Sequence, residues 1–342
     1  MVGITISADS GTTFYSGGAN YNAIARLGDN TFIVAYADEN DSLKGKVIVG
    51  TRAGTSITVN SGDVVTFEAG EVMEIGITAL TATLFVISYV DVSDSNTVKM
   101  VAGTVSGTTI TLGDIATSGI SGGNDTAICT LDSTHFIIST IFTPMCYSLI
   151  GSISGTTITT SGLTRFDDGS AACSKCDVVA LNSTDFVNVF NEGGNTIARV
   201  GIADIGGSAI TMGAKSDYGA YTGAPKVASF DSLHFVIAQY STVMAGSIDE
   251  VTHAITQGSF VAHGMGAGYY SICTMDSTHF IVSANDLYGT PTIGELVAGS
   301  LSGSTTLTMD AQGVVTFDTS TISYTTICKL TSDYFIAGFK HA

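Results

Sequence analysis

Two short loops rich in carboxylate and hydroxyl side chains are the first places where this chain could do chemistry. They are Asp38-Glu39-Asn40-Asp41 and Asp91-Val92-Ser93-Asp94-Ser95-Asn96. Hard oxygen ligands at such short spacing can hold calcium, although neither loop matches an EF-hand. Asp, Asn and Ser are also ordinary turn residues. The sequence therefore offers Asp38, Asp41, Asp91 and Asp94 as candidate binding residues. No cofactor is expected, although calcium is possible in these loops, and a plain turn is the alternative.

Tyrosines form a second group of candidates. Aromatic side chains on exposed loops are common anchors for a bound partner. The tyrosines expected on long loops are Tyr218, Tyr221, Tyr269, Tyr270 and Tyr288. We predict that these loops share one face with the acidic loops. The alternative is that the tyrosines pack inside the fold.

The six cysteines allow a thiol, a disulfide or a metal interpretation. Cys129, Cys273 and Cys328 each lie two residues before an apolar residue that ends a strand-like run, a slot otherwise filled by small residues. Buried cysteine suits such a slot as a small hydrophobic residue. Cys173 and Cys176 form a lone C-x-x-C, which is two ligands short of a zinc site. Cys146 could approach this pair, so a disulfide and a zinc site both stay open.

Three histidines, His135, His234 and His279, precede a phenylalanine in equivalent turns. Equivalent positions in successive repeats are too far apart to share one metal ion, so we expect exposed turn residues. The sequence contains no G-x-S-x-G, P-loop, H-E-x-x-H or dinucleotide fingerprint. No enzyme motif of these kinds therefore points to a catalytic residue.

The element that must position these residues is a repeat of about fifty residues. An apolar residue, a polar turn and a Phe-led apolar run recur seven times, with the phenylalanine at positions 32, 85, 136, 186, 235, 280 and 335. The segment 126–160 serves as the type case, with strand-like runs at 126–131, 136–140, 148–153 and 156–160, here called strands a, b, c and d. Four antiparallel strands per repeat are typical of a β-propeller blade.

We therefore predict an all-β chain that folds as one seven-bladed propeller domain over residues 1–342. Ile4 precedes Leu27 by the same 23 residues that separate strand d from the next strand a in three other repeats. This spacing predicts that residues 3–7 form a strand that joins the last blade and closes the ring, which would protect an open sheet edge. The last repeat is too short for a strand c, so the seventh blade should be irregular.

The repeat units 103–113 (GTVSGTTITLG) and 50–70 (GTRAGTSITVNSGDVVTFEAG) resemble a repeat of uncharacterised phage and bacterial propeller proteins. That resemblance implies a virion appendage or another surface-exposed structural protein, and it brings no catalytic residues. Residues 7–14 (SADSGTTF) also resemble the Asp-box of sialidase-type propellers, which is a structural turn. A sialidase reaction would need an arginine cluster, and the four arginines (Arg26, Arg52, Arg165 and Arg199) do not share a repeat slot.

The net charge of the chain makes some classes of binding partner unfavourable. The net charge of −18 disfavours nucleic acid and anionic membranes, because both need clustered Lys and Arg. The N-terminus lacks the pattern of a secretory signal, and no apolar run is long enough to span a membrane. We expect a chain made as a soluble cytoplasmic product that works on a virion or another extracellular surface.

The sequence favours a non-enzymatic structural or adhesive propeller, a phage-like virion surface or tail-associated protein. Its partners would be other subunits of an assembly or a host surface. A glycan-binding lectin is the first alternative, and a hydrolase of the sialidase or glycosidase type is the second. The absence of Trp weakens the lectin alternative, although Tyr can also stack on sugars.

Overall fold

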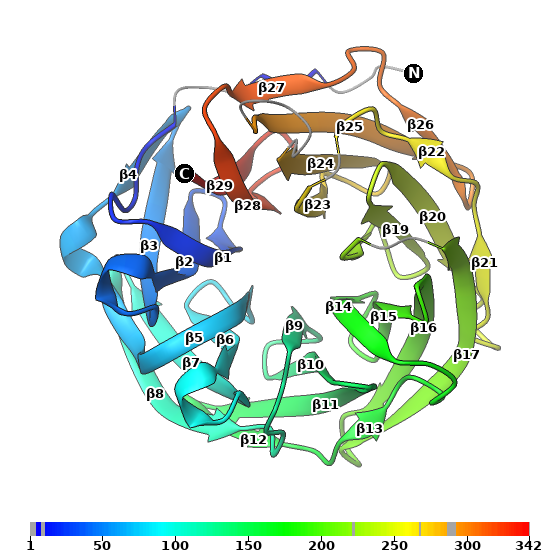
Figure 1. The fold of residues 1–342 in the computed structure, drawn as a ribbon, viewed down its shortest axis with the longest axis horizontal. Coiled ribbons are helices and arrows are strands. Elements are labelled where there is room, and N and C mark those ends of the chain that lie inside the picture. Colours follow the sequence, from blue (N-terminus) through cyan, green and yellow to red (C-terminus); the bar gives the residue numbers. More distant parts are fainter. Residues whose placement is uncertain (1–4, 8–10, 221–222, 267, 286–291, 342) are drawn as a thin grey trace. The chain divides into compact units, whose positions relative to one another are not determined.

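The computed structural model describes residues 5–7, 11–220, 223–266, 268–285 and 292–341. The secondary structure of these residues consists of β-strands and three short 3-10 helices, with no α-helix among them, which confirms the all-β class (Figure 1). The chain divides into two compact units. The first unit comprises Ser10–Ser174 and Ala203–Ile210, and the second comprises Met1–Asp9, Lys175–Ile202 and Thr211–Ala342.

The first three repeats, here called modules one to three, form the sheets of the first unit. Module one contains β1 (Ala19–Gly28), β2 (Thr31–Asp38), η1 (Glu39–Asp41), β3 (Lys44–Ala53), β4 (Ser56–Val59), η2 (Ser61–Asp63) and the start of β5 (Val65–Ala79). Module two contains the rest of β5, β6 (Leu84–Asp91), η3 (Val92–Asp94), β7 (Thr97–Ser106) and β8 (Thr109–Thr117). Module three contains β9 (Asp125–Thr130), β10 (His135–Phe142), β11 (Met145–Ser154), β12 (Thr157–Thr160) and β13 (Thr164–Arg165).

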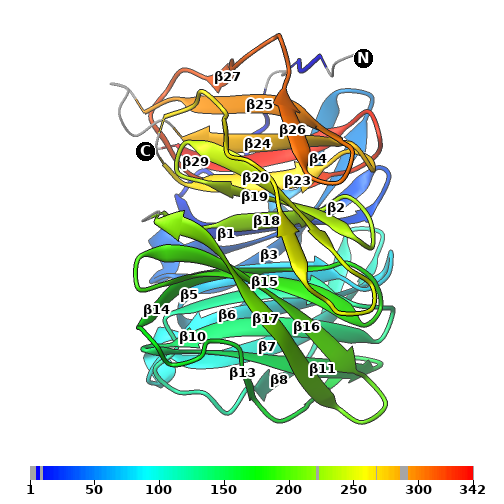
Figure 2. The same cartoon turned by 90° about the vertical axis from the view of Figure 1, so that its right-hand side faces the viewer.

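Modules four to seven follow. Module four contains β14 (Cys173–Ala180), β15 (Asp185–Glu192), β16 (Asn195–Asp204) and β17 (Ala209–Ala220). Module five contains β18 (Lys226–Ser229), β19 (His234–Gln239), β20 (Thr242–Ile248), β21 (Ile255–Gln257) and β22 (Val261–Ala262). Module six contains β23 (Tyr270–Thr274), β24 (His279–Asn285), β25 (Gly294–Ser302), β26 (Thr306–Met309) and β27 (Val315–Asp318), and module seven contains β28 (Ile322–Lys329) and β29 (Phe335–His341). Figure 2 shows β23, β24 and β25 side by side, as their antiparallel pairing requires.

The structure has one feature beyond the four strands that the sequence repeat predicted, which is a second pairing partner of strand c. In modules three, five and six, the outer edge of strand c carries two partners, because a two- to four-residue strand follows strand d and pairs with the same neighbour. In module one this second partner is the beginning of β5, whose end pairs with β6 of module two. One continuous strand of 15 residues therefore belongs to two modules.

A phenylalanine–glycine pair sets the register of strands b and c in the first six modules. Each strand-b phenylalanine lies directly opposite a strand-c glycine; the pairs are Phe32–Gly50, Phe85–Gly103, Phe136–Gly151, Phe186–Gly201, Phe235–Gly246 and Phe280–Gly299. A Cβ atom built on Gly151 would lie 2.1 Å from Cζ of Phe136. The ring therefore occupies the space above the glycine, as aromatic side chains do when they cover glycine in a sheet.

The sheets are apolar on both faces because neighbouring modules of a unit pack against each other. Val49 of module one and Phe85 of module two belong to one buried cluster of the first unit, and Met100 and Phe136 join module two to module three. In the second unit, a buried cluster joins modules five and six in the same way. This packing explains the continuous apolar runs of strand b.

In modules three, five and six, the polar turn before strand b is built on one aspartate side chain. Asp276 accepts hydrogen bonds from the backbone N–H groups of Thr278 and His279, and it contacts Nδ1 of His279 at 2.9 Å. Asp132 and Asp231 make the same turn with their own histidines. These histidines are therefore parts of structural turns, and their side chains are only about one-quarter exposed.

The last module is irregular, as expected, with only β28 and β29 among its described residues. Residues 3–4 of the expected closing strand lie outside the described residues, and Thr5–Ser7 are not in a strand. Ile6 is nevertheless buried, in a cluster with Met275 and Ile327 of the second unit. Its backbone N–H donates to the side chain of Gln312, whose amide donates back to the Ile6 carbonyl. The N-terminal segment is thus anchored by side-chain contacts where a strand was expected.

Replacing Gly151 by alanine should destabilise the protein, because the new methyl group and the Phe136 ring cannot both fit. Overpacking of this kind typically costs about 1–3 kcal/mol. Gly28→Ala is the matched control, since no atom lies within 4 Å of its added Cβ. Urea unfolding followed by circular dichroism measures both variants. Equal midpoints for the two variants would contradict the packing role of the pair.

Acid should destabilise the turns. Although burial raises the pKa of Asp276, the hydrogen bonds from Thr278 and His279 outweigh it and lower that pKa to about 2. A carboxylate with a depressed folded-state pKa stabilises the fold above its unfolded pKa of about 4 and loses this contribution as the pH falls toward 2. Asp276→Asn should reduce this acid sensitivity while it keeps the turn, because Asn182 makes the same turn in module four. The measurement is the thermal midpoint between pH 7 and pH 2, and an unchanged slope in the variant would contradict the assignment.

Candidate functional site

A cavity of about 390 Å³ lies in module one of the first unit. Its lining combines aromatic, acidic and basic side chains and consists of Thr13, Phe14, Tyr15, Ser16, Tyr36, Asp38, Lys46, Ser61 and Val64. The segment before β1 supplies one wall, the end of β2 and β3 supply the second, and the residues around η2 supply the third. Pockets with apolar walls and a few convergent polar groups are the usual form of small-molecule sites.

The polar centre of the cavity is the pair formed by Tyr15 and Asp38. The Tyr15 hydroxyl donates a hydrogen bond of 2.5 Å to Oδ1 of Asp38, which also accepts from the backbone N–H of Asn40 and so caps η1. Asp38 is only 6% exposed. Burial, the hydrogen bond to Asp38 and the negative charges of Asp38 and Asp41 raise the pKa of Tyr15 to about 12. The tyrosine is therefore protonated at neutral pH and holds the carboxylate in place.

Tyr36 forms the floor of the cavity between two other rings. Its ring centroid lies 5.4 Å from that of Phe14 and 5.3 Å from that of Tyr15. The side chain is fully buried, and its hydroxyl has no hydrogen-bond partner among the described residues. Burial raises the pKa of Tyr36, so the hydroxyl keeps its proton. A buried donor without a partner is costly for the fold, which makes it a candidate contact for a ligand.

Module two contains the equivalent position in a satisfied form. There Phe67 packs on Tyr89 with ring centroids 5.1 Å apart, and the Tyr89 hydroxyl donates to Glu68 at 3.0 Å. Beside Tyr36, Tyr15 takes the place that Glu68 has beside Tyr89, and the Tyr15 hydroxyl donates to Asp38. The replacement of glutamate by Tyr15 removes the hydrogen-bond acceptor of the Tyr36 hydroxyl. Module one therefore departs from the repeat at residues that line the cavity.

Lys46 is the second charged residue among those that line the cavity, and it is basic. Nζ of Lys46 lies 2.7 Å from Asp41 and 2.9 Å from the Thr66 hydroxyl. Lys44 also binds Asp41, and these two lysines lower the pKa of the half-buried Asp41 carboxyl. Asp41 is thus neutralised by two cations, whereas the hydrogen bonds found on the Asp38 side chain come from uncharged donors.

The other acidic candidates have structural roles. Asp91 caps η3 by accepting from the N–H of Asp94 and the Ser93 hydroxyl, and Lys99 bridges Asp91 and Asp94. Burial raises the pKa of Asp91, but its bonds to Lys99 and Ser93 lower it further, so the carboxylate is ionised. Because ammonium groups hold Asp41, Asp91 and Asp94, these loops are poorly suited to calcium, and only Asp38 lines the cavity.

The tyrosine candidates do not form one binding face. Tyr218 and Tyr270 are buried, at 3% and 4% exposure, in the cores that join the sheets of the second unit, so they correct the expectation of loop contacts. Tyr269 is half exposed and stacks on Tyr324 with centroids 5.1 Å apart. Tyr221 and Tyr288 lie outside the described residues. Packing between modules thus accounts for two of the five.

No disulfide joins any of the six cysteines, all of which lie among the described residues. Cys129 and Cys273 are buried, as expected for a packing slot, while Cys328 is intermediate in exposure. Cys146 does approach Cys173, but the group of potential metal ligands found among the described residues joins these two to Asp167 and does not include Cys176. The described residues contain no helix with the length and hydropathy of a membrane span.

Sequence reasoning missed Tyr15, Tyr36 and Lys46. Alignment of the repeats contained a usable signal, since Phe14 and Phe67 recur while the residue after them changes from Glu68 to Tyr15. Which residue the Tyr15 hydroxyl would contact depends on the path of the segment before β1. That path is set by tertiary packing and not by the repeat.

No family model matches this chain, and no curated protein does. Solved structures do match. The periplasmic gluconolactonase of Pseudomonas aeruginosa is 8% identical with a TM-score of 0.61, and the match covers 85% of this chain and 88% of that one. A putative 6-phosphogluconolactonase of Bacteroides fragilis is 9% identical with a TM-score of 0.61, over 86% and 84% of the two chains. The NanB sialidase of Streptococcus pneumoniae is 9% identical with a TM-score of 0.52, over 98% and 67%.

At these identities the likeness concerns the fold, which is that of β-propeller-like lactonases and sialidases. The comparisons overturn the expectation of a non-enzymatic virion or adhesive protein, because the matched chains are enzymes. The resemblance to phage repeats was carried by turn and strand residues such as those in 103–113, which the fold requires whatever the function.

Proposed function

We propose that this chain is a hydrolase of sugar-derived substrates, with the cavity of module one as its substrate site. The observation that carries the proposal is the Tyr15–Asp38 pair beside the unpartnered Tyr36 hydroxyl. Aromatic walls formed by Phe14 and the two tyrosines suit the faces of a sugar ring. A volume of about 390 Å³ is in the range of small-ligand sites. The fold shared with lactonases and sialidases supports the same class.

Within that class, a sugar lactone is the substrate that fits best. A glycosidase of the usual kind needs two carboxyl groups at a defined separation, and the second nearby carboxylate, Asp41, is held by two lysines. A sialidase needs arginines for the substrate carboxylate, and none of the residues that line the cavity is an arginine. Lactone hydrolysis needs one general base and donors for one oxyanion.

Each cavity residue then has a role. Asp38 takes a proton from water as the water oxygen attacks the lactone carbonyl carbon. The Tyr36 hydroxyl and the Lys46 ammonium group stabilise the oxyanion, and Tyr15 fixes the orientation of Asp38. The bond from the carbonyl carbon to the ring oxygen breaks, and the ring oxygen receives the proton, which yields the open hydroxy acid.

Asp38→Asn should lower the rate of lactone hydrolysis by roughly 10²–10⁴-fold, the usual contribution of a general base. D-Glucono-1,5-lactone and a panel of other sugar lactones serve as probes, with aryl glycosides and a sialoside as competing classes. Asp91→Asn is the matched control, because Asp91 caps the equivalent helix in module two and does not line the cavity. Circular dichroism checks the fold of both variants.

Tyr36→Phe should lower kcat with little effect on stability, since the lost hydroxyl has no partner to leave behind. Tyr89→Phe is its control in module two. If the wild-type protein turned over none of the lactones and glycosides of the panel, the hydrolase proposal would be overturned. Equal activity of the Asp38→Asn variant and the wild type would overturn the site.

We also propose that the seven modules are the blades of one propeller whose last blade is completed by the N-terminal segment. The mutual hydrogen bonds between Ile6 and Gln312 and the burial of Ile6 support this arrangement. An open edge on the two-stranded last sheet would otherwise invite pairing with another chain.

Ile6→Ala should therefore cost about 2–4 kcal/mol of unfolding free energy, as truncation of a buried isoleucine does. Ile115→Ala is the control, because Ile115 is 44% exposed. Urea unfolding and size-exclusion chromatography measure stability and self-association. If Ile6→Ala matched the control in both measurements, the segment would not be a closing element.

A further inference from the structure

A group of three buried potential metal ligands lies in the first unit, away from the residues of the proposed substrate site. It consists of Cys146 on β11, Asp167 in the loop after β13, and Cys173 at the start of β14. One ligand atom from each residue lies within 4.8 Å of the other two. The three residues are 0%, 4% and 2% exposed, so the cluster is buried.

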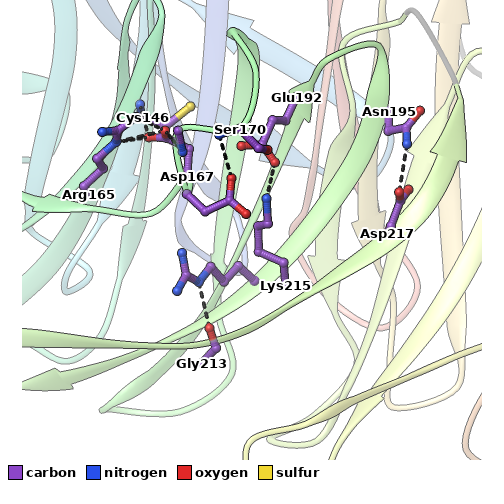
Figure 3. A network of polar contacts seen from close by, with 12 residues as sticks. Cys146, Arg165, Asp167, Ser170, Glu192, Asn195, Gly213, Lys215 and Asp217 are labelled. Atoms are coloured by element: carbon purple, nitrogen blue, oxygen red, sulfur yellow. Dashed lines mark hydrogen bonds and ion pairs between the residues drawn. The ribbon is translucent and has the colours of Figure 1, made fainter.

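The carboxylate of the cluster is already fixed in position. Arg165 donates to Asp167 through Nε, at 2.9 Å from both carboxylate oxygens, and through Nη2, and the backbone N–H of Cys146 donates at 2.8 Å (Figure 3). The backbone N–H of Gly169 donates to the same carboxylate at 2.9 Å. With the bond from Nη2 included, four N–H donors occupy this carboxylate, so a metal ion would take the place of the shared Nε contact on one of its oxygens. Metal-binding carboxylates are commonly oriented by such surrounding hydrogen bonds.

From this arrangement we propose that Cys146, Asp167 and Cys173 form a structural zinc site that fastens the loop between β13 and β14 to strand β11. Two sulfurs and one carboxylate oxygen are a ligand set that Zn²⁺ accepts in tetrahedral geometry, with a water molecule in the fourth position. Zinc bonds of about 2.3 Å to sulfur and about 2.1 Å to oxygen place these atoms roughly 3.6–3.8 Å apart. Since the three ligand atoms lie within 4.8 Å of one another, their separations exceed the zinc geometry by at most about 1 Å.

The charges balance when zinc binds. Both thiols release their protons to solvent, so the ligands carry three negative charges. The zinc ion supplies two positive charges and Arg165 supplies the third. A buried charge cluster is tolerable only when it is neutralised in this way. The guanidinium group therefore compensates the site and also orients its carboxylate.

The loop connects this site to the stability of module three. Phe166 is fully buried, and its backbone N–H donates to the carbonyl of Cys146, while the N–H of Cys173 donates to the carbonyl of Pro144. Backbone hydrogen bonds thus already hold both ends of the loop against β11. Zinc would add a bond through the side chains at the same two positions.

The full-length protein, reduced and stripped with a chelator, should bind one equivalent of Zn²⁺ per chain in equilibrium dialysis with elemental analysis. Co²⁺ in its place should give thiolate charge-transfer absorption and the intense visible bands of a tetrahedral site. The Cys146→Ser, Cys173→Ser double variant should lose both signals, and Cys129→Ser, a buried thiol of the same module, should keep them.

Arg165→Gln keeps all three ligands and should weaken zinc affinity by roughly 10–100-fold, as loss of an orienting neighbour does. If the double variant fails to fold, the Arg165→Gln variant still tests the proposal. Bound zinc should raise the thermal midpoint of the wild type only. The proposal would be overturned if the wild-type protein bound no stoichiometric zinc, or if the double variant bound zinc as the wild type does. It would also be overturned if mass spectrometry found a Cys146–Cys173 disulfide in protein that still rejects zinc after reduction.

Discussion

The contact between a phenylalanine on strand b and a glycine on strand c is the constraint on which the rest of each sheet depends. In six modules the ring fills the space that a side chain on the glycine would need. Because sheet register has a period of two, this single pair fixes which residues of both strands face the neighbouring module. The apolar clusters that join successive sheets within a unit follow from that register. Turns and loops, including those around the cavity, then start from fixed strand ends.

Most of the sheet architecture could be predicted from the sequence, since it depends on local patterns that recur. The position of Phe136 and the turn built on Asp132 repeat with a constant offset, so strands b and c were placed correctly. The second partner of strand c was missed, because segments as short as Thr164–Arg165 carry too few residues for a period to be detected. The strand expected over residues 3–7 depended on spacing alone, and spacing does not distinguish strand pairing from the side-chain anchoring of Ile6 by Gln312.

The candidate site could be predicted only in part. Asp38 was identified as a polar loop residue, but its partners come from the segment before β1 and from β3, which are distant along the chain. Function was misjudged for a related reason. The residues that resemble phage repeats are the glycines, threonines and valines of hairpins, and they report strand and turn requirements. The residues that distinguish the surroundings of Tyr36 in module one from those of Tyr89 in module two are Tyr15 and Glu68, and they lie beside that pattern.

Strand β5 has a consequence for how the chain can be cleaved or divided into fragments. Its first residues complete module one and its last residues begin module two, with no intervening loop. A loop elsewhere in the chain can be nicked by a protease or used as a new terminus without removing a strand, whereas a cut within this segment takes an edge from both sheets. Modules one and two therefore constitute a single mechanical element, and a fragment that ends between them would retain neither sheet intact.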